Sequence, residues 1–547
     1  MKIWTSLVAA IVALVPQQPQ NVEQTSQGPK PPAAIVASFD GMGVGFEGPQ
    51  GKYEGRNPSD NSLAVGPNHI VQTVNSRLAI FSKQGKILYG PVQTNIVFAG
   101  FGGPCEARNN GDAVVRYDQL ADRWLVTMPI FSRIPLTDVG ERPPINEPAP
   151  PGHLAQPGQA ASPGPAAAPP PNPPPPPPPP QRGQRGQPAA GQPATPPPPP
   201  PPGTYAMCYA ISVGPDPLGA YYRYAFERPL FPDYPRPAVW TDGYYNPTSS
   251  SDNRISETIA TQKHACVVDR ASMLKGQPAA EQCQIVLNVN FLNNADIDGK
   301  SLPPDGAPNI MMAAGGTQLD KILESSSIDV WQFHVDWKNP ANTKLTGPVK
   351  LAVAPYHYLC GGQLTNCVPQ PETDRRLDAQ GDKVMSRLVY RRIGGRESIV
   401  AVHSVDTSAG GGGVRWYEFQ LDKTRRVTLR QQGTYAPDKF FRWMASPAID
   451  KLGNIALGYS FGGAPNFAGQ RFTGRLPKDP LGTMTLREAV LVEGEASQVN
   501  TLRWEDYTTT AIDPSDDCTI WYVGDYLKKD AASYSTRIGA FGMPGCR

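Results

Sequence analysis

The chain has 547 residues and a formal net charge of +2 at neutral pH, with 50 lysines and arginines against 48 aspartates and glutamates. It carries neither a basic stripe nor the aromatic and basic motif of an RNA reader, so nucleic acid is not an expected partner. Proline is very common, at 63 residues, and much of it gathers in one segment that cannot build a hydrophobic core.

The first residues have the pattern of an export signal. Met1 and Lys2 precede an apolar run from Ile3 to Val15, which matches the hydrophobic region of a secretory signal and is too short to span a bilayer. We expect residues 1–20 to be a signal peptide and residues 21–32 a linker, with no membrane span in the mature protein. Because residues 13–15 do not match a small-x-small cleavage site, a retained N-terminal anchor is the alternative.

A short hairpin pattern recurs along the chain. Each copy has polar and aromatic residues, a short apolar strand, an Asp or Gly turn and a second apolar strand. The copies cover residues 60–74, 112–127, 236–243, 309–335, 385–402, 442–460 and 503–523. About seven copies, spaced roughly 50 to 80 residues apart outside the proline segment, are close to the size of propeller blades with their loops.

These repeats predict an all-β fold, a β-propeller that covers residues 33–547. Radial repetition of four-stranded sheets protects strand edges, whereas a pair of β-sandwiches has no need of a repeated sequence. We expect seven blades, with six or eight as alternatives. A ring of blades has to close, and the apolar residues 33–39 are suited to pair with the final strand at 535–541.

Residues 135–203 are rich in proline, alanine, glycine and glutamine. Strand-like segments at 124–131 and 204–212 flank them, so we expect a disordered insertion in a loop of one blade. Polyproline is stiff and extended, which suits a contact arm to the cell wall or to another protein. A neutral insertion is the alternative, since long surface loops cost little free energy.

The eight cysteines of an exported chain predict disulfides. The nearest pair is Cys360 and Cys367, which bracket a turn-rich loop. Cys266 with Cys283 and Cys518 with Cys546 are the next pairs by spacing, which leaves Cys105 with Cys208 across the proline segment. A zinc site is disfavoured because no Cys-x-x-Cys motif occurs and the six histidines lie far apart.

In a propeller the innermost strands surround the central axis, so the residues just before each first strand gather at one mouth of the channel. That set supplies candidate catalytic carboxylates and candidate ligand-binding cations and aromatic rings. The carboxylates are Asp60, Asp112 and Asp506; the ligand-binding candidates are Arg236, Arg442, Trp443, Arg503, Trp504 and Tyr507, with Tyr234 beside them. Such groups suit acid and base chemistry on a glycosidic bond and stacking on a sugar. The alternative is structural: the same positions can join neighbouring blades through ion pairs and hydrogen bonds.

Other motifs give little support for a metal site, a phosphate-binding site or a known catalytic site. Asp296 and Asp298 resemble the start of a calcium loop, but two prolines follow where further ligands would stand, so an Asp-rich turn is favoured over a metal site. The glycines at 410–413 have no phosphate-binding Lys or helix after them, and no nucleophile elbow or His-Glu-x-x-His motif occurs. No cofactor is expected.

Several segments resemble an uncharacterised family of large secreted bacterial proteins regarded as propeller-like. The resemblance lies in residues 112–124, 433–437, 442–460, 472–475 with 479–484, and 503–526. It implies an exported β-rich domain and supplies no catalytic residues. The turn from Ser446 to Gly453 also resembles, distantly, the Asp-box of sialidase-like propellers, although its spacing departs from that box and the Thr-Trp ending is missing.

Together these patterns predict a secreted, periplasmic or cell-surface β-propeller that acts as a binding or interaction module. Polysaccharide or an envelope protein is the expected partner. The alternative is an enzyme that resembles glycoside hydrolases and acts on polysaccharide through the axial carboxylates and arginines. The sequence does not decide between a binding module and an enzyme.

Overall fold

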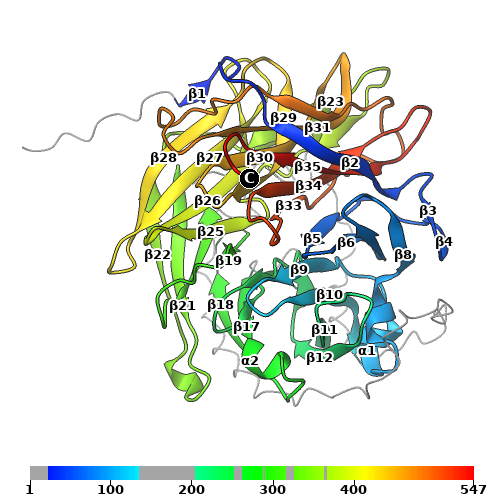
Figure 1. Cartoon of the computed structure of the whole chain (residues 1–547), viewed down its shortest axis with the longest axis vertical. Helices are drawn as coiled ribbons and strands as arrows, with labels where there is room; N and C mark the ends of the chain where they lie inside the picture. The colour runs from blue at the N-terminus through cyan, green and yellow to red at the C-terminus, as the bar shows by residue number, and fades with distance from the viewer. Residues whose placement is uncertain are drawn as a thin grey trace, which may run out of the picture.

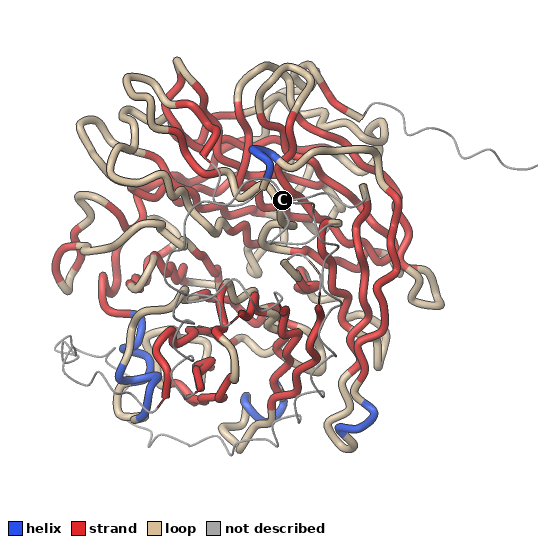
Figure 2. The backbone as a smooth tube through the Cα atoms, turned by 180° about the vertical axis from the view of Figure 1, so that it is seen from behind, coloured by secondary structure: helices blue, strands red, loops and turns tan. Residues whose placement is uncertain are grey.

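The computed structural model describes residues 22–134, 204–251, 262–287, 289, 291–315, 326–362 and 366–547. The predicted signal peptide and the predicted proline-rich insertion lie outside these residues. The described chain is all-β, as predicted: strands make up most of it and the few helices are short (Figure 2). Among the described helices none is long and apolar enough to cross a membrane.

The strands form successive antiparallel sheets in chain order (Figure 1). The first sheet contains β5 (Ser62–Val65), β6 (His69–Val74), β7 (Arg77–Ser82) and β8 (Ile87–Gln93). The second contains β9 (Val114–Asp118), β10 (Arg123–Ile134), β11 (Thr204–Ser212) and β12 (Tyr221–Arg228). The third contains β13 (Phe231–Asp233), β14 (Ala238–Val239), β15 (Tyr244–Tyr245), β16 (Thr248–Ser251), β17 (Gln262–Val268) and β18 (Glu281–Leu287).

The middle of the chain forms one wide sheet from two four-stranded halves, which join where β19 and β25 pair in parallel. The fourth-sheet half contains β19 (Asn293–Asp298), β20 (Asn309–Ala314), β21 (Ser327–His334) and β22 (Lys344–Ala352). The fifth-sheet half contains β25 (Leu388–Ile393), β26 (Arg396–Asp406), β27 (Gly412–Leu421) and β28 (Val427–Tyr435), with β1 (Glu23–Gln24) at its edge.

Two further sheets complete the order. The sixth contains β29 (Phe441–Ile449), β30 (Ile455–Gly463), β31 (Asn466–Arg475) and β32 (Ala489–Val492). The seventh contains β33 (Thr509–Ile512), β34 (Thr519–Tyr526), β35 (Ser535–Gly542) and β2 (Ala34–Gly43). The small elements are β3 (Glu47–Gly48), β4 (Gly51–Lys52), β23 (Asn366–Pro369), β24 (Arg376–Asp378), α1 (Gly103–Ala107), α2 (Arg270–Met273) and the 3-10 turns at Thr94–Phe98, Pro340–Asn342 and Leu359–Gly361.

The alternation of side chains along each strand places the hydrophobic core between the sheets. On β26, Ile399 and Ala401 pack into a cluster with residues of the fourth sheet, whereas Val400 and Val402 pack into a cluster with residues of the sixth. Successive residues of a strand point to opposite faces, so a strand that is apolar at every position is buried on both sides. Each sheet is therefore covered by its two neighbours.

The first strands of successive sheets lie side by side in a closed ring. Neighbours in this ring are β5, β9, β14, β19, β25, β29 and β33, and β33 lies again beside β5. The N-terminal strand β2 pairs with β35 at the outer edge of the seventh sheet, with Phe39 opposite Ile538 (Figure 1). The predicted pairing of residues 33–39 with 535–541 is thus confirmed, and it ties the two ends of the described chain into one sheet.

All four predicted disulfides are present. They join Cys105 to Cys208, Cys266 to Cys283, Cys360 to Cys367 and Cys518 to Cys546. Four disulfides indicate a protein of an oxidising compartment.

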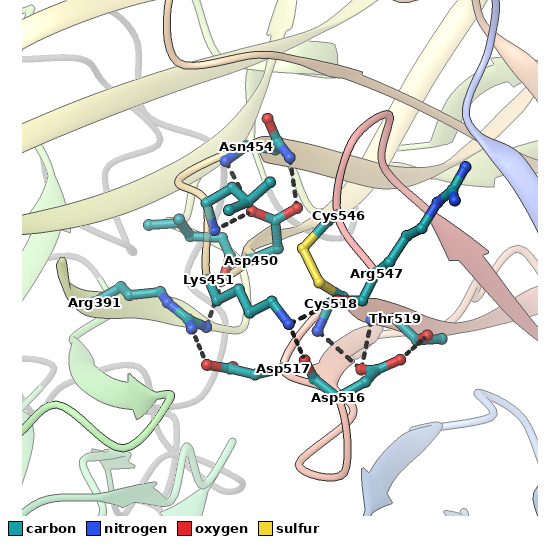
Figure 3. The surroundings of a disulfide bond; sticks show 12 residues. Arg391, Asp450, Lys451, Asn454, Asp516, Asp517, Cys518, Thr519, Cys546 and Arg547 are labelled. Atoms are coloured by element: carbon teal, nitrogen blue, oxygen red, sulfur yellow. Dashed lines mark hydrogen bonds and ion pairs between the residues drawn. A yellow bond between two sulfur atoms is a disulfide. The ribbon is translucent and has the colours of Figure 1, made fainter.

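The Cys518–Cys546 disulfide lies among charged residues of the turn before β34 (Figure 3). There Arg391 pairs with Asp517, and Lys451 Nζ donates to the carbonyl oxygens of Asp516 at 3.0 Å and Arg547 at 2.8 Å. The disulfide thus fixes the last residues of the described chain against the seventh sheet.

Removing this disulfide should destabilise the protein. We expect Cys518→Ser/Cys546→Ser to lower the free energy of unfolding by about 2–4 kcal/mol, since the bridge closes a long loop in the unfolded chain. Its two cysteines are 28 residues apart, whereas those of the control bridge between Cys360 and Cys367 are 7 apart. In denaturant unfolding the control variant should lose about 1 kcal/mol less. Equal losses would contradict the loop argument.

Candidate functional site

The turns before the first strands hold their side chains with a left-handed backbone. Asp60, Tyr234, Gln380 and Asp506 have φ values of 47°, 55°, 48° and 69°. Each stands before a different first strand: β5, β14, β25 and β33. Side chains other than glycine adopt this conformation only at a cost of the order of 1 kcal/mol each, and such strain gathers at functional sites.

A cavity of about 430 Å³ lies where these turns meet. We call it the ring pocket. Its lining is Arg56, Asn57, Pro58, Asp60, Asn75, Ser76, Asn110, Gly111, Asp112, Phe131, Asp233, Tyr234, Phe291, Gln380, Lys383, Arg503 and Asp506. All three predicted carboxylates therefore line one cavity, together with the predicted Arg503 and Tyr234.

Burial raises the pKa of two of the carboxyl groups. Asn75 Nδ2 donates to Asp60 at 3.1 Å, and the Tyr507 hydroxyl donates to Asp112 at 3.1 Å. Burial raises the pKa of Asp60 well above its usual range, and the charges of Asp112 and Asp506 raise it further. Burial, with the charges of Asp233 and Asp506, raises the pKa of Asp112 to about 8. Asp112 is thus the candidate acid of the ring pocket.

Asp506 is bound by an arginine and by an amide. It forms an ion pair with Arg503 and accepts a hydrogen bond from Gln380 Nε2 at 2.8 Å. Asp378 accepts from the same amide at 3.2 Å, and burial together with the charge of Asp506 raises the pKa of Asp378 to about 6. The pocket therefore holds neighbouring carboxyl groups in different surroundings, since burial raises the pKa of Asp112 whereas Asp506 is paired with an arginine; acid and base catalysis relies on such a difference.

Aromatic rings and a buried lysine form another part of the site. Tyr234 stacks on Tyr507 with ring centroids 4.5 Å apart, and Phe291 lies 5.1 Å from Tyr234. Lys383 Nζ lies 4.0 Å from the Phe291 ring and donates to Gln380. Burial lowers the pKa of Lys383, although the charges of Asp382 and Asp506 act in the opposite direction. Arginine and lysine thus stand beside the carboxyl groups as fixed donors.

Four of the predicted ligand-binding residues lie elsewhere. Arg442 is fully buried and forms ion pairs with Asp438 at 2.9 Å and Glu488 at 2.6 Å. Trp443 and Trp504 are fully buried in the core. Arg236 is buried behind the pocket, where it lies 4.5 Å from the Tyr234 ring. These four side chains fit the structural reading of the repeat positions.

Tyr507 also does not line the cavity, and it reaches the site through its hydrogen bond to Asp112.

The two weak metal candidates are engaged in a buried ion network. Asp296 and Asp298 lie on β19, where Arg387 Nε donates to Asp296 at 2.6 Å and Arg387 Nη2 to Asp298 at 2.5 Å. Arg116 lies 3.5 Å from Asp296. Among the described residues the one cluster with metal-like geometry is Cys266, Glu281 and Cys283, and its two cysteines are bonded to each other.

Sequence reasoning missed Asp233, Phe291, Asp378, Gln380 and Lys383. All five lie in or near the segments that precede the first strands β14, β19 and β25. The signal that found Asp60 and Asp112 was therefore available for them. For Phe291 it failed because β19 was not recognised as the first strand of its sheet, since the copy there was placed at 309–335. For the other four it was not applied far enough upstream of the copies at 236–243 and 385–402.

Comparisons with known proteins show no matching family model and no matching curated protein. The resemblance to a family of secreted bacterial proteins therefore stays an expectation. Among solved structures the chain is loosely similar to a PL25 polysaccharide lyase described as an ulvan lyase, with a TM-score of 0.36 and 10% identity, covering 92% of this chain and 95% of that one. It is similar in the same way to the polysaccharide lyase Uly1, with a TM-score of 0.35 and 10% identity, covering 94% and 98%. Likeness at this level concerns the fold and says nothing of activity.

Proposed function

We propose that the chain is an exported β-propeller whose seven sheets are its blades. The closed ring of first strands supports this proposal, as does the N-terminal strand β2 in the outer position of the last sheet. Closing a ring with the two ends of the chain protects the edges of its sheets. In this arrangement residues 1–20 are the signal peptide, residues 21–32 a linker, and residues 135–203 an insertion between β10 and β11.

We propose further that the ring pocket binds polysaccharide and cleaves it by acid and base catalysis. The observation that carries this proposal is that one open cavity is lined both by Asp112, whose pKa burial raises to about 8, and by Asp506, which forms an ion pair with Arg503. In the proposed step Asp112 gives its proton to the glycosidic oxygen as the bond to the anomeric carbon breaks. Asp506 takes a proton from the attacking water, whose oxygen forms the new bond to that carbon.

Other groups of the pocket hold the substrate and set the charges. Arg503 and Lys383 donate hydrogen bonds to sugar oxygens, and Tyr234 and Phe291, which line the pocket, give a sugar ring an apolar contact. Asp60 adds a further carboxyl group whose pKa burial raises well above its usual range.

A binding or interaction module is the second candidate. It is favoured by hydrogen bonds that join the pocket residues across the ring: Tyr507 precedes β33 but bonds Asp112 before β9, and Gln380 before β25 bonds Asp506 before β33. Such bonds are what a scaffold that joins blades requires.

A screen of the purified protein against acidic and neutral polysaccharides, for binding and for turnover, tests both candidates. An Asp112→Asn/Asp506→Asn variant is measured beside it. Turnover that the variant loses supports the enzyme. Binding without turnover contradicts the enzyme and supports the module. If neither binding nor turnover is found, the ring pocket is not a polysaccharide site.

The raised pKa of Asp112 also predicts how stability depends on pH. The pKa of Asp112 is about 8 in the folded protein and near 4 in the unfolded chain. Its contribution to stability is therefore fully present below pH 4 and is lost as the pH rises through about 8. Asp112→Asn should therefore raise the free energy of unfolding at pH 9 by about 1–2 kcal/mol, after allowance for its partial exposure, with little effect near pH 4. Thermal unfolding at both pH values checks this. A variant less stable than the wild type at pH 9 would contradict it.

A further inference from the structure

A second cavity continues the ring pocket outward along the first two sheets. Its volume is about 370 Å³, and it shares Arg56, Asn75, Ser76 and Asn110 with the ring pocket. We call this second cavity the outer groove. Since the two cavities share part of their lining, together they form one elongated cleft.

Charge is divided between the two ends of this cleft. The outer groove is lined by Arg56, Arg77 and Arg108, with Glu54 as its one acidic residue. The ring pocket is lined by four aspartates: Asp60, Asp112, Asp233 and Asp506. A ligand that fills both cavities meets three arginines at the outer end, and four aspartates with Arg503 and Lys383 among them at the inner end.

Hydrogen bonds fix the wall of the outer groove. Asn109 Nδ2 donates to the carbonyl of Ser76 at 2.8 Å, and the side-chain oxygen of Asn109 accepts from the backbone nitrogen of Asn95 at 3.3 Å. Asn95 Nδ2 donates to the carbonyl of Glu106 at 2.8 Å, and Arg77 Nε to that of Glu54 at 2.9 Å. The groove is therefore formed in advance, so that ordering it costs a bound chain little.

We propose that the outer groove holds the anionic groups of an acidic polysaccharide whose next units enter the ring pocket. This inference rests on the proposed polysaccharide function of the ring pocket and adds the class of substrate. Guanidinium groups bind carboxylate and sulfate through paired donors. An uncharged unit suits the ring pocket better than an anionic one, because four aspartates line it.

The test compares polymers that differ only in charge. The probes are polygalacturonate against its methyl ester, and dextran sulfate against dextran, so that carboxylate and sulfate are distinguished. Arg56→Gln is the main variant, because Arg56 is exposed and its loss leaves the core intact. Arg77→Gln is the second variant. The control is Arg426→Gln, which removes an exposed arginine from the turn between β27 and β28, a segment that does not line the cleft.

We expect the wild type to prefer the anionic member of a pair. Arg56→Gln and Arg77→Gln should each weaken its binding about 3–10-fold at low salt and reduce the dependence of affinity on salt. Arg426→Gln should leave the affinity unchanged.

Two results overturn the inference, and they are distinguishable. Equal affinity for charged and neutral members, unaffected by Arg56→Gln, contradicts the acidic substrate and leaves the ring-pocket proposal intact. The absence of binding to all four polymers contradicts the proposed function and this inference with it.

Discussion

We expect Arg387→Gln to lower the free energy of unfolding by about 3–5 kcal/mol, the loss typical of a buried ion pair that loses one partner. Asp296 and Asp298 are 3% and 4% exposed, and both are bound by this one guanidinium group. Arg387 Nη1 also donates to the carbonyl of Thr510 at 3.2 Å, which links the fifth sheet to the seventh. Urea unfolding followed by tryptophan fluorescence measures the effect.

A compensated variant shows whether unpaired charge is the cause. In Arg116→Met/Asp296→Asn/Asp298→Asn/Arg387→Met the two carboxylates and the two guanidinium groups that face them are all removed, so most of the lost stability should return. Arg392→Gln is the control. Arg392 also lies on β25, but its Nη1 donates to the exposed carbonyl of Leu302 and not to a buried carboxylate. If the compensated variant stays as unstable as Arg387→Gln, the loss comes from packing and not from charge.

Those parts of the fold that depend on local pattern were predicted from the sequence. The hairpins at 442–460 and 503–523 match β29 with β30 and β33 with β34, because each contains two apolar strands around a polar turn. The closing strand was predicted because a ring has to pair its ends. The disulfide pairs were predicted because the spacing of the cysteines left few choices. Asp60, Asp112 and Asp506 were found because the residues before each first strand meet at one place.

Parts that depend on contacts distant in sequence were not predicted. The segment around Asp296 and Asp298 has the composition of a turn, yet it forms β19, because Arg387 and Arg116 neutralise its carboxylates inside the protein. Arg442 resembles Arg503 in the repeat, yet Asp438 and Glu488 bind it away from the ring pocket. In both cases the partner that decides the role lies in another segment, and a repeat pattern does not contain it.

We expect Asp112→Asn to reduce polysaccharide turnover about 10²–10⁴-fold, the range typical of losing a general acid. The pH dependence identifies the role. Since Asp112 must hold its proton and burial raises its pKa to about 8, wild-type kcat/KM should fall as the pH rises through about 8. An amide cannot give up such a proton, so the residual activity of the variant should lack this alkaline fall.

The control separates catalysis from a general effect of charge. Asp305→Asn removes an exposed carboxylate from the turn between β19 and β20 and should keep both the rate and the pH profile. If Asp112→Asn loses turnover but keeps the alkaline fall near pH 8, another group holds the proton. Asp60 is then the acid to test, because it is the other carboxyl group of the ring pocket whose pKa burial raises well above its usual range. The two aspartates precede neighbouring first strands, β5 and β9, so exchanging their roles would leave the ring pocket as the site of the reaction.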